Sequence, residues 1–281
     1  MRIQIKVPNN SAVTPGTTAV WKLPIGRRYH ALQLEYSGTT FNLTHMTAIR
    51  VKANGQVIHE VNGAERDSMN QFDGRAAAAG ILTIPFDRFS LYSQKGEEAT
   101  AVQTGTADPQ TGIAITLFEL EIDIAAGAVA PAVLVTATQS DNDPSVPGPG
   151  LILRTLKFSK TFGVSGIQEV ADLPKATEGA KYRFLNRTFI KTANTVDLEI
   201  TRDNYQIFQR KATVNSRVQL DGVRSPQAGY FVFDPTEEGY DFEPIALATP
   251  AGAPFQDFRY RLNLSAAETA VFVQEYIGSL Q

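Results

Sequence analysis

The stretch IRVKANG at positions 49–55 alternates apolar and polar residues and ends in the pair Asn54-Gly55. Alternation with a period of two is typical of a β-strand with one buried face. Asn-Gly favours a two-residue type I′ turn, because both residues tolerate the positive φ angles that this turn needs. We therefore predict a β-hairpin that joins residues 48–53 to residues 56–61.

A second stretch of the same form, LEITRDN, occupies positions 198–204 and ends in Asp203-Asn204, 149 positions after the first turn (203 minus 54). The pair Leu-Pro also occurs twice after a strand-like run, at 23–24 and at 173–174, an offset of 150 (173 minus 23). A near-constant offset of about half the chain indicates duplication of a whole domain, not a short solenoid repeat.

Strand-like runs recur through both halves at the spacing of about 8–12 residues that is typical of sandwiches and barrels. In the run at 113–124, Glu119, Glu121 and Asp123 share the face opposite the apolar residues. We interpret this run as a strand whose acidic face contacts solvent or another subunit. Helix signals are few, and we expect short helices at 64–72 and 86–93, both in connections between strands.

The predicted fold class is therefore all-β, with two tandem eight-stranded jelly rolls, a double jelly roll, and a few short helices in loops. A pair of immunoglobulin-like domains is the alternative, but each half is longer than the ~100 residues that such domains use. Four prolines at 131, 144, 147 and 149 mark a linker. We expect a first jelly roll at 1–126, a linker at 127–150 in which 133–138 pairs at most at a sheet edge, and a second jelly roll at 151–281.

The composition excludes several functional classes. The net charge is −3 and no basic run is longer than Arg27-Arg28, which argues against a dedicated nucleic-acid binder. With no cysteine, the chain has no disulfide, cysteine nucleophile or thiolate metal site. The first residues alternate like a strand and do not form a signal peptide, and no stretch approaches the ~18 apolar residues of a membrane span. We expect synthesis in the cytosol and a soluble chain until assembly.

Residues that could carry out catalysis are sparse. The histidines are His30, His45 and His59, all in the first half, without the clustering that a cupin metal site needs. The stretch GVSG at 163–166 lacks the spacing of a nucleophile elbow. We predict no catalytic and no cofactor-binding residue. Carboxylate pairs of a glycosidase are recognised by their separation in space, so a hydrolase stays open as an alternative.

Asp141-Asn142-Asp143 resembles the start of a calcium loop, because hard cations prefer several oxygen ligands from one turn. Pro144 interrupts the pattern, and an ordinary Asx-turn is the favoured interpretation. A metal site is therefore left open, with Asp141 and Asp143 as weak candidates.

Several segments together carry a resemblance to a known family: residues 22–29, 34–39, 49–58, 169–174 and 273–278. In order and spacing they are similar to the major capsid proteins of corticoviruses, which are tailless bacteriophages with an internal membrane. More broadly, the chain resembles the double jelly-roll capsid lineage. The resemblance spans nearly the whole chain, except for residues 74–111 and the proline-rich linker.

The resemblance implies a structural capsid subunit and no enzyme. It implies homotrimers that form pseudo-hexagonal capsomers and tile an icosahedral shell, with vertex or penton proteins, minor capsid proteins and weak peripheral contacts to the internal membrane as partners. Direct sequence-specific nucleic-acid binding is not implied. The expected location is the virion capsid, after synthesis in the host cytoplasm. Such proteins can use calcium between subunits. The alternative is a double jelly-roll carbohydrate-binding protein or glycan-processing hydrolase.

Overall fold

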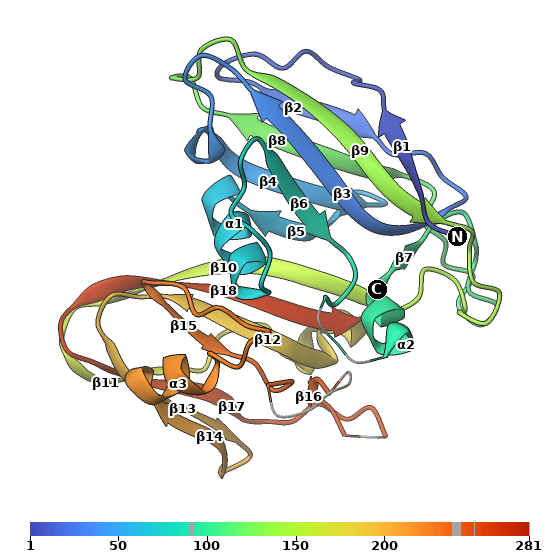
Figure 1. The fold of residues 1–281 in the computed structure, drawn as a ribbon. Helices are drawn as coiled ribbons and strands as arrows, with labels where there is room; N and C mark the ends of the chain where they lie inside the picture. Colours follow the sequence, from blue (N-terminus) through green and yellow to red (C-terminus); the bar gives the residue numbers. More distant parts are fainter. Residues whose placement is uncertain (90, 92, 238–242, 250, 281) are drawn as a thin grey trace. The chain divides into compact units, whose positions relative to one another are not determined.

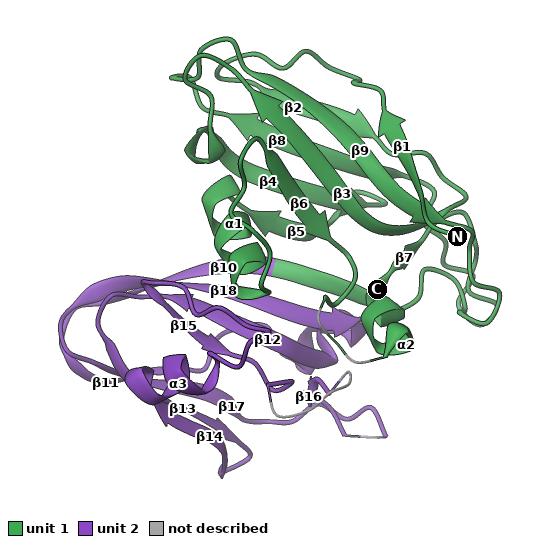
Figure 2. Ribbon diagram, in the orientation of Figure 1, with its two compact units in different colours: residues 1–155, 280 green, residues 156–279, 281 purple. Residues whose placement is uncertain are grey.

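The computed structural model describes the chain except for residues 90, 92, 238–242, 250 and 281. It divides into two compact units, residues 1–155 with Leu280 and residues 156–279 (Figure 2). Each unit has its own hydrophobic core. Nearly all regular structure in both units is β (Figure 1).

The first unit is built from two antiparallel sheets. One has the strand order β1-β9-β3-β6, and the other has the order β2-β8-β4-β5. The short strand β7 (Val102–Gln103) adds to β3. The eight main strands are β1 (Ile3–Val7), β2 (Thr18–Lys22), β3 (Arg28–Ser37), β4 (Met46–Ala53), β5 (Gln56–Val61), β6 (Ile81–Pro85), β8 (Phe118–Ile124) and β9 (Ala132–Ser140).

The second unit repeats this topology strand for strand. Its sheets have the orders β15-β12-β18-β10 and β11-β17-β13-β14, with β16 (Ile245–Ala246) paired to β12. Each strand holds the place of its counterpart in the first unit, so two jelly rolls in tandem are confirmed. The strands are β10 (Ile152–Phe162, of which 152–155 belong to the first unit), β11 (Gly166–Val170), β12 (Phe184–Lys191), β13 (Thr195–Arg202), β14 (Tyr205–Lys211), β15 (Tyr230–Phe233), β17 (Phe258–Leu264) and β18 (Glu268–Gly278).

The two predicted hairpins fall at the same place in the two units. Asn54-Gly55 joins β4 to β5, and Asp203-Asn204 joins β13 to β14. All four residues have positive φ, at 50° and 79° in the first turn and 46° and 66° in the second. These are the angles of a type I′ turn, as the residue types predicted.

Short helices occupy connections between strands. Helix α1 (Gly63–Phe72) follows β5, begins with a capping box of Asn62 and Glu65, and confirms the helix expected at 64–72. Helix α3 (Ala212–Val218) follows β14, the matching place in the second unit. The remaining helices are α2 (Gln94–Glu97) and the 3₁₀ turns η1 (Leu43–His45), η2 (Glu98–Thr100), η3 (Ala176–Glu178) and η4 (Ala180–Tyr182).

The helix expected at 86–93 is wrong for the residues of that range that the structure describes. The Phe86 side chain is buried, and its backbone N–H donates to His30 O at 2.9 Å, which extends the contact between β6 and β3. The helix α2 begins only at Gln94, where the Ser93 hydroxyl accepts from the Gly96 N–H. Burial of Phe86 against the sheet therefore outweighs the local helix signal.

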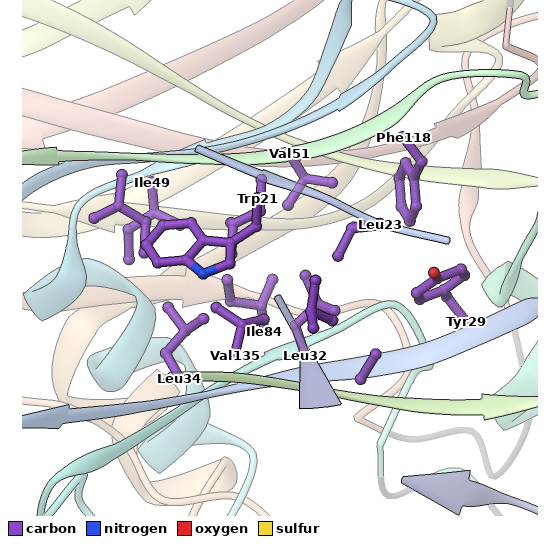
Figure 3. Close-up of a cluster of buried hydrophobic side chains, with 14 of the residues drawn as sticks. Trp21, Leu23, Tyr29, Leu32, Leu34, Ile49, Val51, Ile84, Phe118 and Val135 are labelled. Atoms are coloured by element: carbon purple, nitrogen blue, oxygen red, sulfur yellow. The ribbon is translucent and has the colours of Figure 1, made fainter. Parts of the chain in front are cut away.

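The core of the first unit lies between its two sheets. Trp21 of β2 is fully buried and packs among apolar side chains from both sheets (Figure 3). Burial of such side chains stabilises the fold by about 25 cal/mol per Å² of apolar surface. Those drawn and labelled beside Trp21 are Leu23, Tyr29, Leu32, Leu34, Ile49, Val51, Ile84, Phe118 and Val135.

The core of the second unit is rich in aromatic residues. Phe231 and Phe233 of β15 and Phe258 and Tyr260 of β17 are all buried, as expected of aromatic residues in a packed core. The Tyr260 hydroxyl lies 3.0 Å from Thr188 Oγ1 and 3.1 Å from Gln274 Oε1, and burial raises its pKa well above the ordinary value.

The segment expected as a linker at 127–150 contains β9, which lies between β1 and β3 in the middle of a sheet. It therefore corrects the expectation of an edge pairing at 133–138. The prolines fall outside the strand, with Pro131 just before it and Pro144 after it, so they remove no ladder hydrogen bond. Val133, Val135 and Ala137 of β9 are buried. The structure divides the chain after Thr155.

Candidate assembly surfaces

A partly buried network of polar side chains joins His30 of β3 to residues beyond β6 and at the end of β9. His30 Nδ1 lies 2.9 Å from Asp87 Oδ2, and His30 Nε2 lies 2.9 Å from Ser140 Oγ. Arg2 adds an ion pair to Asp87 at 2.9 Å. Serine, histidine and aspartate in this order are the groups of a hydrolase triad. The sequence carries no signal for this grouping, because its members are far apart in the chain.

The surroundings of this hydrogen-bonded network favour a structural role for it. A small cavity beside it is lined by His30, Asp87 and Arg2, but Ser140, which would be the nucleophile, is not among its lining residues. The Ser140 hydroxyl also lies within hydrogen-bond distance of Asp141 O, at 3.1 Å. The hydrogen-bonded network therefore connects three segments at one end of this sheet.

The other two histidines have local roles. His45 Nδ1 lies 3.0 Å from Asn42 Oδ1 and completes the cap of η1. His59 of β5 is buried, with its ring 5.5 Å from that of Phe86 in an edge-on arrangement. Within the described part of the chain, no three histidine and carboxylate side chains form a group that could hold a metal ion.

Both carboxylates of the predicted calcium turn have partners in the chain. Asp141 pairs with Arg27. Asp143 Oδ1 accepts from the Ser145 N–H at 2.9 Å and from its hydroxyl at 2.6 Å, which is the Asx-turn favoured from the sequence. These hydrogen bonds from Ser145 lower the pKa of Asp143 below its usual value. A calcium ion between subunits stays a prediction.

The outer face of the sheet β2-β8-β4-β5 carries a ladder of charges. Lys52 pairs with Glu121 at 2.6 Å, and Arg50 pairs with Asp123. Here β4 supplies the basic residues and β8 the acidic ones, so the acidic face expected at 113–124 lies on β8. Charge pairs across strands stabilise a sheet by roughly 0.2–1 kcal/mol each.

The outer face of the matching sheet β11-β17-β13-β14 carries a similar ladder with the signs exchanged. Arg261 of β17 pairs with Glu199 of β13 at 3.1 Å, and Arg259 pairs with Glu169 of β11 at 3.0 Å. Asn263 adds a hydrogen bond to Asp197 at 2.8 Å. Both ladders satisfy their charges within one face, as solvent-facing sheets do.

The other two sheets differ sharply in burial. Along β9, buried and accessible residues alternate, so its sheet β1-β9-β3-β6 has one open face. Along β12, residues 185–190 are buried without interruption, and so are residues 272–278 of β18. On these strands Arg187 and Glu275 form an ion pair at 2.7 Å with side chains 3% and 1% exposed. Both faces of β12 and β18 are therefore shielded from solvent, whereas the sheet β1-β9-β3-β6 has one solvent-exposed face.

Comparison with known families matches both halves of the chain. Residues 4–140 match the model of the viral coat protein P2 N-terminal domain, and residues 152–280 match that of the viral coat protein P2 C-terminal domain. The chain belongs to the viral coat protein P2 family. The resemblance seen in the sequence is thereby confirmed.

Individual relatives agree with this assignment. The coat protein is 24% identical to the major capsid protein P2 of Pseudoalteromonas phage PM2 over 275 residues, which are 97% of this chain and 94% of the relative. The crystal structure of the major capsid protein P2 from bacteriophage PM2 matches with a TM-score of 0.85 and 21% identity, covering 100% of this chain and 98% of the other. A chain from the atomic structure of Sulfolobus Turreted Icosahedral Virus matches with a TM-score of 0.70 and 11% identity, covering 99% of this chain and 90% of the other.

The family gives the coat protein a structural role in the capsid of a virion, and it does not favour a carbohydrate-binding protein or glycan hydrolase. Among the described residues, no helix has the length and apolar character needed to cross a bilayer. For a coat protein the relevant sites are the surfaces that contact other subunits. The two charged faces, the open sheet face and the helix after β14 are the candidates that the fold presents.

Proposed function

We propose that this coat protein is the major capsid subunit of an icosahedral virus and assembles as a homotrimer. The observation that supports the trimer is the presence of two jelly rolls of identical strand order in one chain. Three copies contribute six such jelly rolls, which suit a pseudo-hexagonal capsomer that tiles a shell. Cyclic association of identical chains is a common way to form a closed oligomer.

The remaining parts of the proposal concern partners and location. The subunit is made in the host cytoplasm and enters a shell over an internal membrane, where it meets vertex or penton proteins and minor capsid proteins. It carries out no catalysis and binds no specific nucleic-acid sequence, in keeping with its net charge of −3. We propose the two structural units as its domains, in place of the division into 1–126 and 151–281 expected from the sequence.

Light scattering coupled to size-exclusion chromatography tests the trimer directly. We expect one species of three times the chain mass of 30.6 kDa at micromolar concentration. Negative-stain microscopy of the same sample should then show tiles with a hexagonal outline. A monodisperse monomer contradicts the proposal, because an obligate interface commonly buries more than ~2,000 Å² and does not dissociate at this concentration.

A further inference from the structure

Helix α3 and the residues after it expose an apolar patch on the second unit. Val214 is 48% exposed, Val218 43%, Leu220 59% and Val223 43%. We call these four residues the α3 patch. An adjacent side of the helix is fixed to the unit, because the buried side-chain amides of Asn215 and Gln219 both donate to Val232 O, at 2.8 and 2.9 Å. The apolar side therefore has a defined orientation.

The helix at the same place in the first unit is covered. In α1, Glu65 is 3% exposed and Met69 is fully buried, and counted from the N-caps they correspond to Val214 and Val218 of α3. The two helices follow equivalent strands, β5 and β14, of equivalent jelly rolls. The same position is therefore buried in one unit and open in the other.

For the sheets the burial is reversed, with the second unit buried and the first unit exposed. The strands β12 and β18 of the second unit are buried on both faces, whereas β3 and β9 of the first unit leave one face open. On that open face Ile81, Glu35 and Leu134 form a row across β6, β3 and β9, since Glu35 pairs in register with both neighbours. Ile81 is 54% exposed and Leu134 43%. We call these three residues the open row.

The first unit thus has a covered helix and an open sheet, and the second has an open helix and a covered sheet. We propose that the α3 patch of one copy packs on the open row of the next copy. Such a contact joins two different surfaces, and contacts of this head-to-tail kind form closed rings when the rotation between copies closes. The inference rests on the proposed trimer and names the two surfaces that form it.

The charges beside the two surfaces are complementary. Lys211 and Arg217 are exposed at the two ends of α3, next to the α3 patch. Glu35 is exposed at the centre of the open row. Opposite charges at the edge of an apolar contact fix its register and suppress wrong pairings. A second copy of this chain therefore matches the α3 patch in both polarity and charge.

Apolar truncation tests the patch. In the double variant Val214→Ser with Val218→Ser, we expect the apparent dissociation constant of the trimer, from sedimentation velocity, to rise about tenfold or more, because exposed valines lose their contact with the next copy. The matched control replaces Ile167 of β11 and Val196 of β13 by serine, since these residues are exposed on other strands of the same unit. Circular dichroism should show both variants folded. An unchanged trimer in the patch variant contradicts the inference.

Charge exchange tests the pairing itself. Glu35→Arg and Arg217→Glu should each weaken the trimer, and the two together should restore it, because the pair is then reversed and not lost. Lys22→Glu on the charged face of the first unit serves as the control. A double variant weaker than both single variants contradicts the inference.

Cross-linking supplies a readout that is independent of affinity. The chain has no cysteine, so Glu35→Cys and Val218→Cys introduce unique sites. A mixture of the two single variants, treated with a short bismaleimide, should give covalent dimers that neither variant gives alone. Trimers without this cross-link overturn the inference and leave the proposed function intact, whereas a wild-type monomer overturns the proposed function.

Discussion

The Glu98 carboxylate in the first unit accepts hydrogen bonds from several side chains. It accepts from Arg2 at 2.8 Å, from Gln94 at 2.9 Å and from Arg28 at 3.3 Å. Burial alone would raise the pKa of Glu98, but the hydrogen bonds from Gln94 and Arg2 outweigh it and hold the pKa below the ordinary value of 4.5. The ionised form therefore stabilises the contact between the N-terminal strand and the segment that contains α2.

The variant Glu98→Gln should lower the free energy of unfolding at neutral pH by about 1–2 kcal/mol, because charged hydrogen bonds are lost. For a carboxyl whose folded pKa is depressed, this stabilisation is present above the unfolded pKa and disappears as the pH falls through the folded value. The wild type should therefore lose its advantage over the variant below about pH 4.5. Urea unfolding between pH 3 and 7 measures this, with Glu119→Gln as the control. A constant difference across this range contradicts the assignment.

At the scale of elements, the turns decide the register of the hairpins. Gly55 has a φ of 79°, and no atom lies within 4 Å of a β-carbon placed there. In Gly55→Ala the cost is therefore conformational, and we expect unfolding to become easier by about 1 kcal/mol. Gly127→Ala is the matched control, since that glycine has open space and no positive φ. Equal urea midpoints for the two variants would show that the turn does not need its left-handed residue.

Most elements could be predicted where turn chemistry and alternation agree, as they do around Asn54-Gly55 and Asp203-Asn204. Four prolines near β9 favour a linker in the sequence, although they all lie outside the ladder of this strand. The pattern at 86–93 favours a helix, although burial of Phe86 against the sheet excludes one at that residue. In each case a tertiary contact outweighs the local signal.

At the scale of the whole molecule, the assembly surfaces could not be predicted from the sequence. In β12 the polar residues Asn186, Arg187 and Thr188 follow one another, yet all are buried. The valines of α3 have the spacing of an ordinary core-facing helix, yet they are exposed. Whether a duplicated element is buried or exposed depends on what packs against it. The residue pattern of the element alone does not carry that information.

Contact with an internal membrane is the last feature that the proposed function requires. The N-terminal strand β1 is paired along its length with β9, so it is held in a sheet, and the chain carries a net charge of −3, which does not favour anionic lipid. We expect the free trimer to stay in the supernatant when vesicles of neutral or anionic phospholipid are sedimented at about 0.15 M salt. Lipid contact then arises in the shell, where many weak contacts act together. Pelleting of the free trimer that persists at high salt would place an apolar membrane-binding element in the subunit itself and contradict this account.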